Sequence, residues 1–308
     1  MLRAIDIDGS ILAFSPTCRI YISSYSNYII NLLGHVLPGL EQKVNILFIS
    51  AEENNLRNYD FKNENKTIRL NFNDEHTIFK TNIIALQKTF LDSGSIYNKR
   101  FGCFCGGKIL NYKENDFIID YSVPNILNVK EAGVNSKLSF QHLYISPALY
   151  HKELNFNKEN RNIDVLTTYI NSGNERREKI FSDMSNNNIN HTNLSKCFNP
   201  IELGENLINS KIIVNVHQKD TNQTFEELRC LPALMKGVIV ISEHCVLENS
   251  IPYGNMIIWC NYKDILKYTK YVLQNYNAYH SKIFNKANIK TLENLHLTNI
   301  DNIKKILV

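Results

Sequence analysis

Two runs rich in β-branched residues constrain the fold of this chain more than any other feature. KIIVNV (211–216) and VIVI (238–241) show no polar alternation, a pattern typical of strands buried on both faces of a parallel sheet. Between them, residues 224–236 have a helical pattern that opens at Thr224, with Glu227 at capping-box spacing. This strand, helix, strand order predicts an α/β fold with right-handed crossovers.

Polar side chains follow both runs at the point where each strand is expected to end. Asn215 and His217 close the first strand, and Ser242 and Glu243 close the second. In open α/β sheets, ligands bind in the crevice outside the carboxyl ends of the strands. The sequence therefore predicts a binding site at this edge.

The same alternation extends along the chain on both sides of residues 151–162, a polar stretch without periodicity that is typical of a linker. We expect an α/β fold of two Rossmann-like domains facing a cleft, residues 1–152 and 153–308. The final segment, 285–308, has helical patterning and is expected to cross back to the first domain. The expected strands are 18–24, 43–50, 67–72, 116–122, 137–146, 163–170, 211–216, 238–241 and 256–260, and the expected helices are 26–37, 76–92, 124–132, 174–184, 201–209, 224–236, 262–276 and 285–308.

Composition excludes some classes of protein. The formal charge of +4 is too small to be a nucleic-acid footprint by itself, so we expect no nucleic-acid partner, although Lys99, Arg100 and Lys108 are basic. No apolar run approaches the roughly 18 to 20 residues of a membrane span. The first residues lack a secretory pattern, and seven scattered cysteines indicate reduced thiols, so we expect a cytoplasmic protein.

Two motifs resemble metal or phosphate sites. Asp6 and Asp8 precede Gly9 in a DxDG pattern, but only a short apolar stretch comes before them, so we interpret them as a solvated turn. Cys103 and Cys105 are separated by one residue, which is poor zinc spacing, and the glycine-rich fingerprints of dinucleotide and P-loop sites are absent. We expect no metal site.

Five charged residues are candidates for function, each with a structural alternative. Glu226 and Arg229 share a helix face, either as a salt pair or as ligands for sugar hydroxyls and phosphate oxygens. Arg176 and Arg177 begin a helix, where cations oppose the dipole unless an anion lies nearby, although a solvated face is the alternative. Asp120 ends a strand and is either a general base or the cap of the next helix.

The second half resembles the donor-binding domain of GT-B-fold glycosyltransferases, in particular the short bacterial and large-virus enzymes grouped with the family-1-like transferases. Three segments carry the resemblance, DVLTTYINSGNERREKIF, KIIVNVHQ and FEELRCLPALMKGVIVISE, and DYSVPNI (120–126) resembles an element of the acceptor domain. The matching residues are Asn174, Arg176, Arg177, Asn215, His217, Glu226, Arg229, Gly237, Ser242 and Glu243.

The resemblance implies a metal-independent, hexosyltransferase-like reaction with a UDP- or GDP-linked sugar as donor and residues 153–308 as its binding domain. Residues 1–152 would bind a glycan, protein or lipid-linked acceptor. By the same resemblance, Glu226 or Glu243 would bind ribose or sugar hydroxyls. Arg229, with Arg176 or Arg177, would steady the diphosphate.

The resemblance makes Asp120 the preferred base for an inverting reaction. The widespread retaining pattern has glutamate where this chain has Pro232, which argues against retaining chemistry. Two alternatives stay open. The first alternative is a transferase that glucosylates modified DNA bases, and the second is a non-catalytic protein of the same fold that binds nucleotide-sugars or glycans.

Overall fold

The structure is a computed structural model, and it describes residues 3–14, 20–49, 59–73, 116–131, 140–169, 174–195, 200–217, 225–245 and 247–307. The chain divides into two compact units, unit 1 (Met1–Ser146 and Leu297–Val308) and unit 2 (Pro147–His296). The sequence predicts this division at 152/153. Several predictions lie outside the described residues: the helix 76–92, Thr224, the pair Cys103 and Cys105, and the basic residues Lys99, Arg100 and Lys108.

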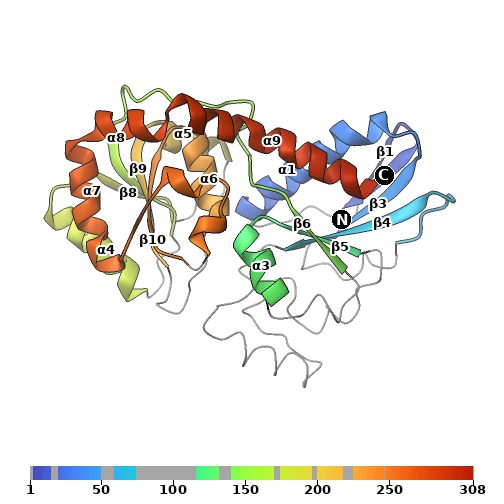
Figure 1. The fold of residues 1–308 in the computed structure, drawn as a ribbon, viewed down its shortest axis with the longest axis horizontal. Coiled ribbons are helices and arrows are strands. Elements are labelled where there is room, and N and C mark those ends of the chain that lie inside the picture. The colour runs from blue at the N-terminus through green and yellow to red at the C-terminus, as the bar shows by residue number, and fades with distance from the viewer. Residues whose placement is uncertain are drawn as a thin grey trace, which may run out of the picture. The chain divides into compact units, whose positions relative to one another are not determined.

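Unit 1 is built on a six-stranded sheet in which the strands follow one another in chain order, β1 to β6 (Figure 1). β1 and β2 pair antiparallel, and the remaining neighbours pair parallel. The strands are β1 (Arg3–Ile7), β2 (Ser10–Phe14), β3 (Val44–Ile49), β4 (Lys66–Asn73), β5 (Asp116–Asp120) and β6 (Phe140–Tyr144). The four strands predicted from residue 43 to residue 146 are confirmed. β3 is buried at every position, whereas β6 has partly exposed side chains and the exposed Gln141.

The DxDG motif forms the turn of a hairpin between β1 and β2. Asp8 and Gly9 both have positive φ angles, 52° and 82°, as a two-residue type I′ turn requires. Asp6 Oδ1 accepts a hydrogen bond from the Gly9 amide at 3.0 Å, and Asp8 pairs with Lys43 at 2.8 Å. The interpretation as a turn is confirmed, whereas the two short flanking strands were missed.

The predicted strand 18–24 is wrong over its described part, because residues 20–24 belong to helix α1 (Ile20–Val36). In the rest of that helix, Tyr25, Ile29 and Leu33 are buried at four-residue spacing. This helical stripe packs into the core, and the helix continues through the preceding β-branched residues, so tertiary packing overrides their strand propensity.

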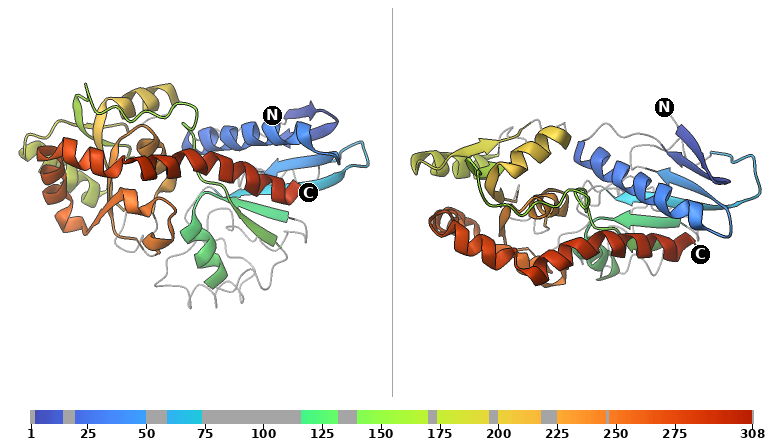
Figure 2. Two further views of the ribbon diagram at one scale, coloured as in Figure 1. Left: turned by 45° about the horizontal axis from the view of Figure 1, so that its top comes forward. Right: turned by 90° about the horizontal axis from the view of Figure 1, so that it is seen from above.

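Helix α9 (Lys286–Leu307) confirms the predicted C-terminal helix, and its last part is grouped with unit 1. Asn299 donates to the Tyr28 hydroxyl of α1 at 2.8 Å and accepts from the Ser146 amide at 2.9 Å. These contacts hold the end of α9 beside α1, as Figure 2 shows. Among the described residues, no helix has the length and apolar character needed to cross a bilayer.

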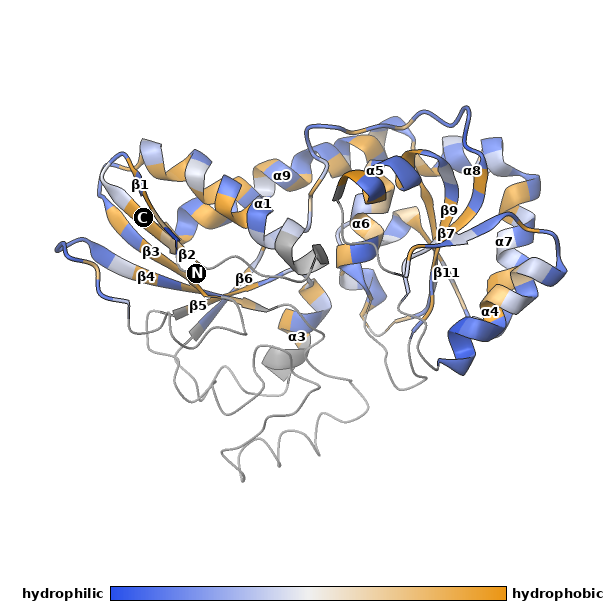
Figure 3. Ribbon diagram, turned by 180° about the vertical axis from the view of Figure 1, so that it is seen from behind, coloured by the Kyte–Doolittle hydropathy of each residue, from blue (hydrophilic) through white to orange (hydrophobic). Residues whose placement is uncertain are grey.

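Unit 2 is built on a parallel five-stranded sheet in the order β11-β10-β9-β7-β8. Its central strands β9 and β10 are buried on both faces, which is why their sequences are continuous apolar runs. Figure 3 shows hydrophobic residues along strands of both sheets. The strands are β7 (Ile163–Thr167), β8 (His191–Asn193), β9 (Ser210–Asn215), β10 (Ile239–Glu243) and β11 (Ile257–Cys260), of which only β8 was not predicted.

Four helices of unit 2 agree with predicted ones apart from their boundaries, and a further helix, α8 (Tyr276–Ile283), was missed. The predicted helix 262–276 is a 3-10 turn (Tyr262–Asp264) followed by α7, and α8 begins at Tyr276. α6 starts at Glu227, so Glu227 opens this helix instead of completing a capping box. The helices are α4 (Glu175–Asn186), α5 (Pro200–Ile208), α6 (Glu227–Met235), α7 (Ile265–Gln274) and α8 (Tyr276–Ile283), and α3 (Val123–Glu131) belongs to unit 1.

Arg161 ties together the amino-terminal side of unit 2. Its side chain is buried and donates to the carbonyls of Asn157, Leu207, Ser210 and Lys236. Burial lowers the pKa of its guanidinium. The arginine thus links the predicted linker segment to the end of α5, the start of β9 and the end of α6.

Candidate anion-binding site of unit 2

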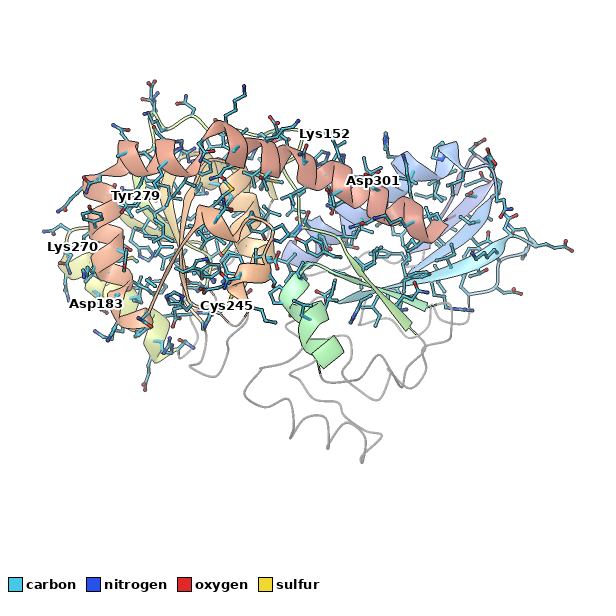
Figure 4. The ribbon with its side chains drawn as sticks, viewed as in Figure 1. Lys152, Asp183, Cys245, Lys270, Tyr279 and Asp301 are labelled. Carbon is cyan, nitrogen blue, oxygen red and sulfur yellow. The ribbon has the colours of Figure 1, made fainter. Side chains whose placement is uncertain are left out.

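The order of the strands in unit 2 places a switch point between β7 and β9. From β7 the chain continues to β8 on one side and later to β9 on the other. Such a reversal leaves a crevice outside the carboxyl ends of the two strands, where ligands of open α/β sheets bind. Cys245, two residues beyond β10, marks this edge of the sheet in Figure 4.

Tyr169 organises the switch point. It is completely buried, donates its hydroxyl to the Val214 carbonyl and accepts from the Val216 amide at 2.6 Å. Burial raises the pKa of this phenol, so the hydroxyl stays protonated. The Tyr169 ring is also within cation–π range of two guanidinium groups, with Arg177 4.3 Å and Arg229 4.9 Å from the ring centroid.

Arg177 comes from the first turn of α4. Asn174 is the N-cap of this helix, and its side chain accepts from the Arg177 amide at 3.1 Å. The guanidinium is buried and donates to the Val216 carbonyl at 3.3 Å. Burial, and next the positive charge of Arg229, lower the pKa of Arg177. Two guanidinium groups beside one ring create a positive site.

Arg229 comes from α6 and is held by three side chains. Its Nε donates to the Thr168 hydroxyl at 2.9 Å, and its Nη1 donates to Asn215 Oδ1 at 2.8 Å. Glu226 lies 3.8 Å away, a salt pair across one turn. Asn215 in turn donates to the Ser242 hydroxyl at 3.0 Å, which links the ends of β9 and β10.

Glu243 is engaged in contacts within the fold. Its carboxylate accepts from Arg176 Nη2 at 2.5 Å and from the His217 amide at 2.7 Å. Tyr262 stacks on Arg176 at 4.1 Å and donates its hydroxyl to the Arg176 carbonyl at 2.8 Å. The sequence predicts that an anion lies near the arginines at the start of α4. For Arg176, this anion is the carboxylate of Glu243.

The structure brings together nine of the ten predicted site residues. Asn174, Arg176, Arg177, Asn215, His217, Glu226, Arg229, Ser242 and Glu243 lie around the carboxyl ends of β7, β9 and β10. Sequence reasoning missed Thr168, Tyr169 and Tyr262. Thr168 and Tyr169 are polar residues at the end of a predicted strand. The same pattern identified Asn215 and His217, so it could have identified these two residues as well.

Asp120 belongs to unit 1, where it ends β5. Its carboxylate is buried and accepts from the Ser122 amide at 2.9 Å and the Asn125 side chain at 3.0 Å. These bonds organise the start of α3, which is the capping alternative considered for this residue. The role of Asp120 as a general base stays a prediction.

Glu227 is separate from this set. It is completely buried, and its carboxylate accepts a hydrogen bond from the Tyr253 hydroxyl at 2.7 Å. Among the described residues, no group of three or more His, Cys, Asp or Glu side chains is arranged to hold a metal ion.

No family model matches this chain. A curated relative, an uncharacterized protein of Acanthamoeba polyphaga mimivirus, is 26% identical over 191 residues, which are 60% of this chain and 64% of the relative. The match therefore spans less than two thirds of that protein. A crystal structure of the DNA-modifying enzyme β-glucosyltransferase, in the presence and absence of uridine diphosphoglucose, aligns over 92% of this chain and 93% of its own at 14% identity and a TM-score of 0.45.

Proposed function

We propose that unit 2 binds the diphosphate of a nucleotide-sugar and that the chain is a glycosyltransferase. One observation carries the proposal: Arg177 and Arg229 approach the ring of Tyr169 at the switch point of a parallel sheet. A ligand with two adjacent phosphates would offset the repulsion between the two guanidinium groups. The sequence resemblance to donor-binding domains supports the same assignment.

The start of α4 adds to the positive character of this site. The amides of its first turn point toward the carboxyl edge of the sheet, and helix amino-termini attract phosphate groups. The Asn174 side chain caps this turn, because it accepts a hydrogen bond from the Arg177 amide. The diphosphate leaving group of a sugar transfer would gain charge here as its bond to the anomeric carbon breaks.

Glu226 is our candidate for contact with ribose or sugar hydroxyls. Its side chain is 27% exposed, whereas the Glu243 side chain is 10% exposed and is used by Arg176 and His217. A carboxylate that keeps solvent contact can accept from a ligand hydroxyl without breaking bonds of the fold. We propose a UDP- or GDP-linked donor, a glycan, protein or lipid-linked acceptor, and Asp120 as the base in an inverting reaction.

A thermal-shift screen against UDP-, GDP-, CMP- and dTDP-sugars without added metal tests the donor site. A ligand at 100 times its dissociation constant adds about 2.7 kcal/mol of stability, which raises the melting temperature by several degrees. The shift is expected with one nucleotide family and is expected to disappear in Arg229→Ala. Lys179→Ala is the matched control, because Lys179 is 63% exposed on α4 and pairs with Asp183.

The outcomes separate the hypotheses. Absence of a shift with every nucleotide-sugar rejects the donor site. A shift that is retained in Arg229→Ala also rejects it. If a donor binds, release of free nucleoside diphosphate by the purified protein, slow in water and faster with acceptor, indicates a transferase. Binding without any release indicates the non-catalytic alternative.

A further inference from the structure

Three tyrosine rings form a cluster on the outer surface of α7 and α8. Tyr268 is 37% exposed and Tyr271 is 53% exposed. Tyr279 packs edge-to-face against Tyr271 with ring centroids 5.8 Å apart. We call Tyr268, Tyr271 and Tyr279 the tyrosine cluster. Exposed aromatic rings that gather in one place provide flat surfaces on which other rings can stack.

The fold of unit 2 does not use the outer face of α7. Ile265, Thr269 and Val272 are the residues of this helix that are buried, and they form the stripe that faces the sheet. Tyr268 and Tyr271 lie outside this stripe. The packing of α7 against the sheet therefore does not require an aromatic ring at either position.

A row of lysines runs beside the tyrosine cluster. Lys267 and Lys270 are exposed on α7 three residues apart, which places them on one side of the helix, and the exposed Lys263 lies in the 3-10 turn that precedes it. Lys270 also donates to the side chain of Asn187, the C-cap of α4, at 3.1 Å. We call these residues the lysine row. Figure 4 shows Lys270 and Tyr279 along the same margin of unit 2.

Charge in this part of the chain is concentrated and positive. Residues 262–283 contain four lysines and one aspartate, a formal charge of +3, although the whole chain carries only +4. Asp183, on the neighbouring helix α4, is neutralised by its ion pair with Lys179 at 3.1 Å. The surface therefore complements a polyanion, which the net charge of the chain does not indicate.

We infer that the tyrosine cluster and the lysine row form a binding surface for single-stranded nucleic acid. Unpaired bases stack on exposed aromatic rings, and lysines beside the rings contact the phosphates. An anionic membrane would also attract the lysines, but insertion into a bilayer favours Trp, Phe and Leu side chains. The large hydrophobic side chains that are exposed on α7 are both tyrosines, Tyr268 and Tyr271. This surface does not depend on the proposed sugar transfer.

Fluorescence anisotropy with a labelled oligothymidylate of about 16 nucleotides tests the inference at low salt. We expect saturable binding to the full-length protein that weakens about 5- to 150-fold in Tyr271→Ala, because one stacked base is lost. Tyr271→Phe should retain binding, since the ring remains. Lys267→Ala with Lys270→Ala should lower the slope of log K against log salt by about 1.4 in magnitude.

Lys304→Ala with Lys305→Ala is the matched control, because these two lysines are exposed on α9 and should leave the binding unchanged. Both tyrosine variants change exposed side chains, and thermal melting confirms that they fold. The inference is overturned if the protein does not bind oligothymidylate, or if Tyr271→Ala and the Lys267/Lys270 pair bind as tightly as the parent. Binding to phosphatidylserine vesicles that is lost in the same variants, without oligothymidylate binding, would assign the surface to membranes instead.

Discussion

The carboxylate of Glu243 accepts a hydrogen bond of 2.5 Å from the guanidinium of Arg176, a residue 67 positions earlier in the chain. This pair joins the end of β10 to the first turn of α4. The second oxygen of Glu243 binds the His217 amide at the end of β9. A single carboxylate therefore aligns two strand ends and one helix start, and the proposed phosphate site is built on that alignment.

Breaking this pair should destabilise unit 2. In Arg176→Met, Glu243 keeps its charge in a largely buried place without the guanidinium, and we expect a loss of about 1–3 kcal/mol in the free energy of unfolding. Urea denaturation measures it. Glu243→Gln and the double variant complete a cycle that isolates the coupling between the two side chains. Strictly additive losses would show that the pair is not coupled.

Replacing the neighbouring Arg177 should affect ligand binding more than the stability of the fold. Because its guanidinium is buried beside that of Arg229, Arg177→Met removes a repulsion as well as one hydrogen bond, and the free energy of unfolding should stay within about 1 kcal/mol of the parent. The stabilisation by a nucleotide-sugar should be lost. Lys179→Met on the same helix is the control. A variant that loses stability but still binds the nucleotide-sugar would make Arg177 a structural residue.

Gly237 is required where α6 returns to β10. Its φ is +69°, and a Cβ at this position would lie 2.6 Å from the Asn155 carbonyl oxygen and 2.9 Å from Arg161. Gly237→Ala should therefore cost more than about 2 kcal/mol. Gly34→Ala, inside α1 with no atom within 4 Å of the added Cβ, should instead gain up to about 1 kcal/mol. Equal effects of the two changes in chemical denaturation would contradict this account.

His280 should contribute to a loss of stability at mildly acidic pH. Burial, and next the charge of Arg161, lower the pKa of His280 to about 4 in the folded protein. The unfolded chain, with a histidine pKa near 6.5, binds the proton first as pH falls. Stability is therefore lost between about pH 6.5 and pH 4, by up to about 3 kcal/mol. Chemical denaturation across this range should show a shallower pH dependence in His280→Gln, and an unchanged dependence would exclude His280 as the cause.

Local patterns in the sequence determined most of the secondary structure. The runs at 211–216 and 238–241 specify strands because every residue after Lys211 in the first run, and every residue of the second, is buried in the sheet. Patterns failed where local propensity and packing disagree. The β-branched residues before Tyr25 have strand propensity, yet their backbone extends a helix whose later turns are buried. The three residues of β8 are too few to show any periodicity.

The sequence also placed polar residues at the right strand ends, because residue order alone decides which side chains follow a strand. Only the tertiary structure decided how these residues pair. Arg176 and Arg177 are adjacent in the chain, yet one binds Glu243 and the other approaches Tyr169 beside Arg229. The spacing of residues in a sequence predicts contacts only within one helical turn or along one strand. Contacts between residues tens of positions apart depend on strand order, and strand order is a property of the folded sheet.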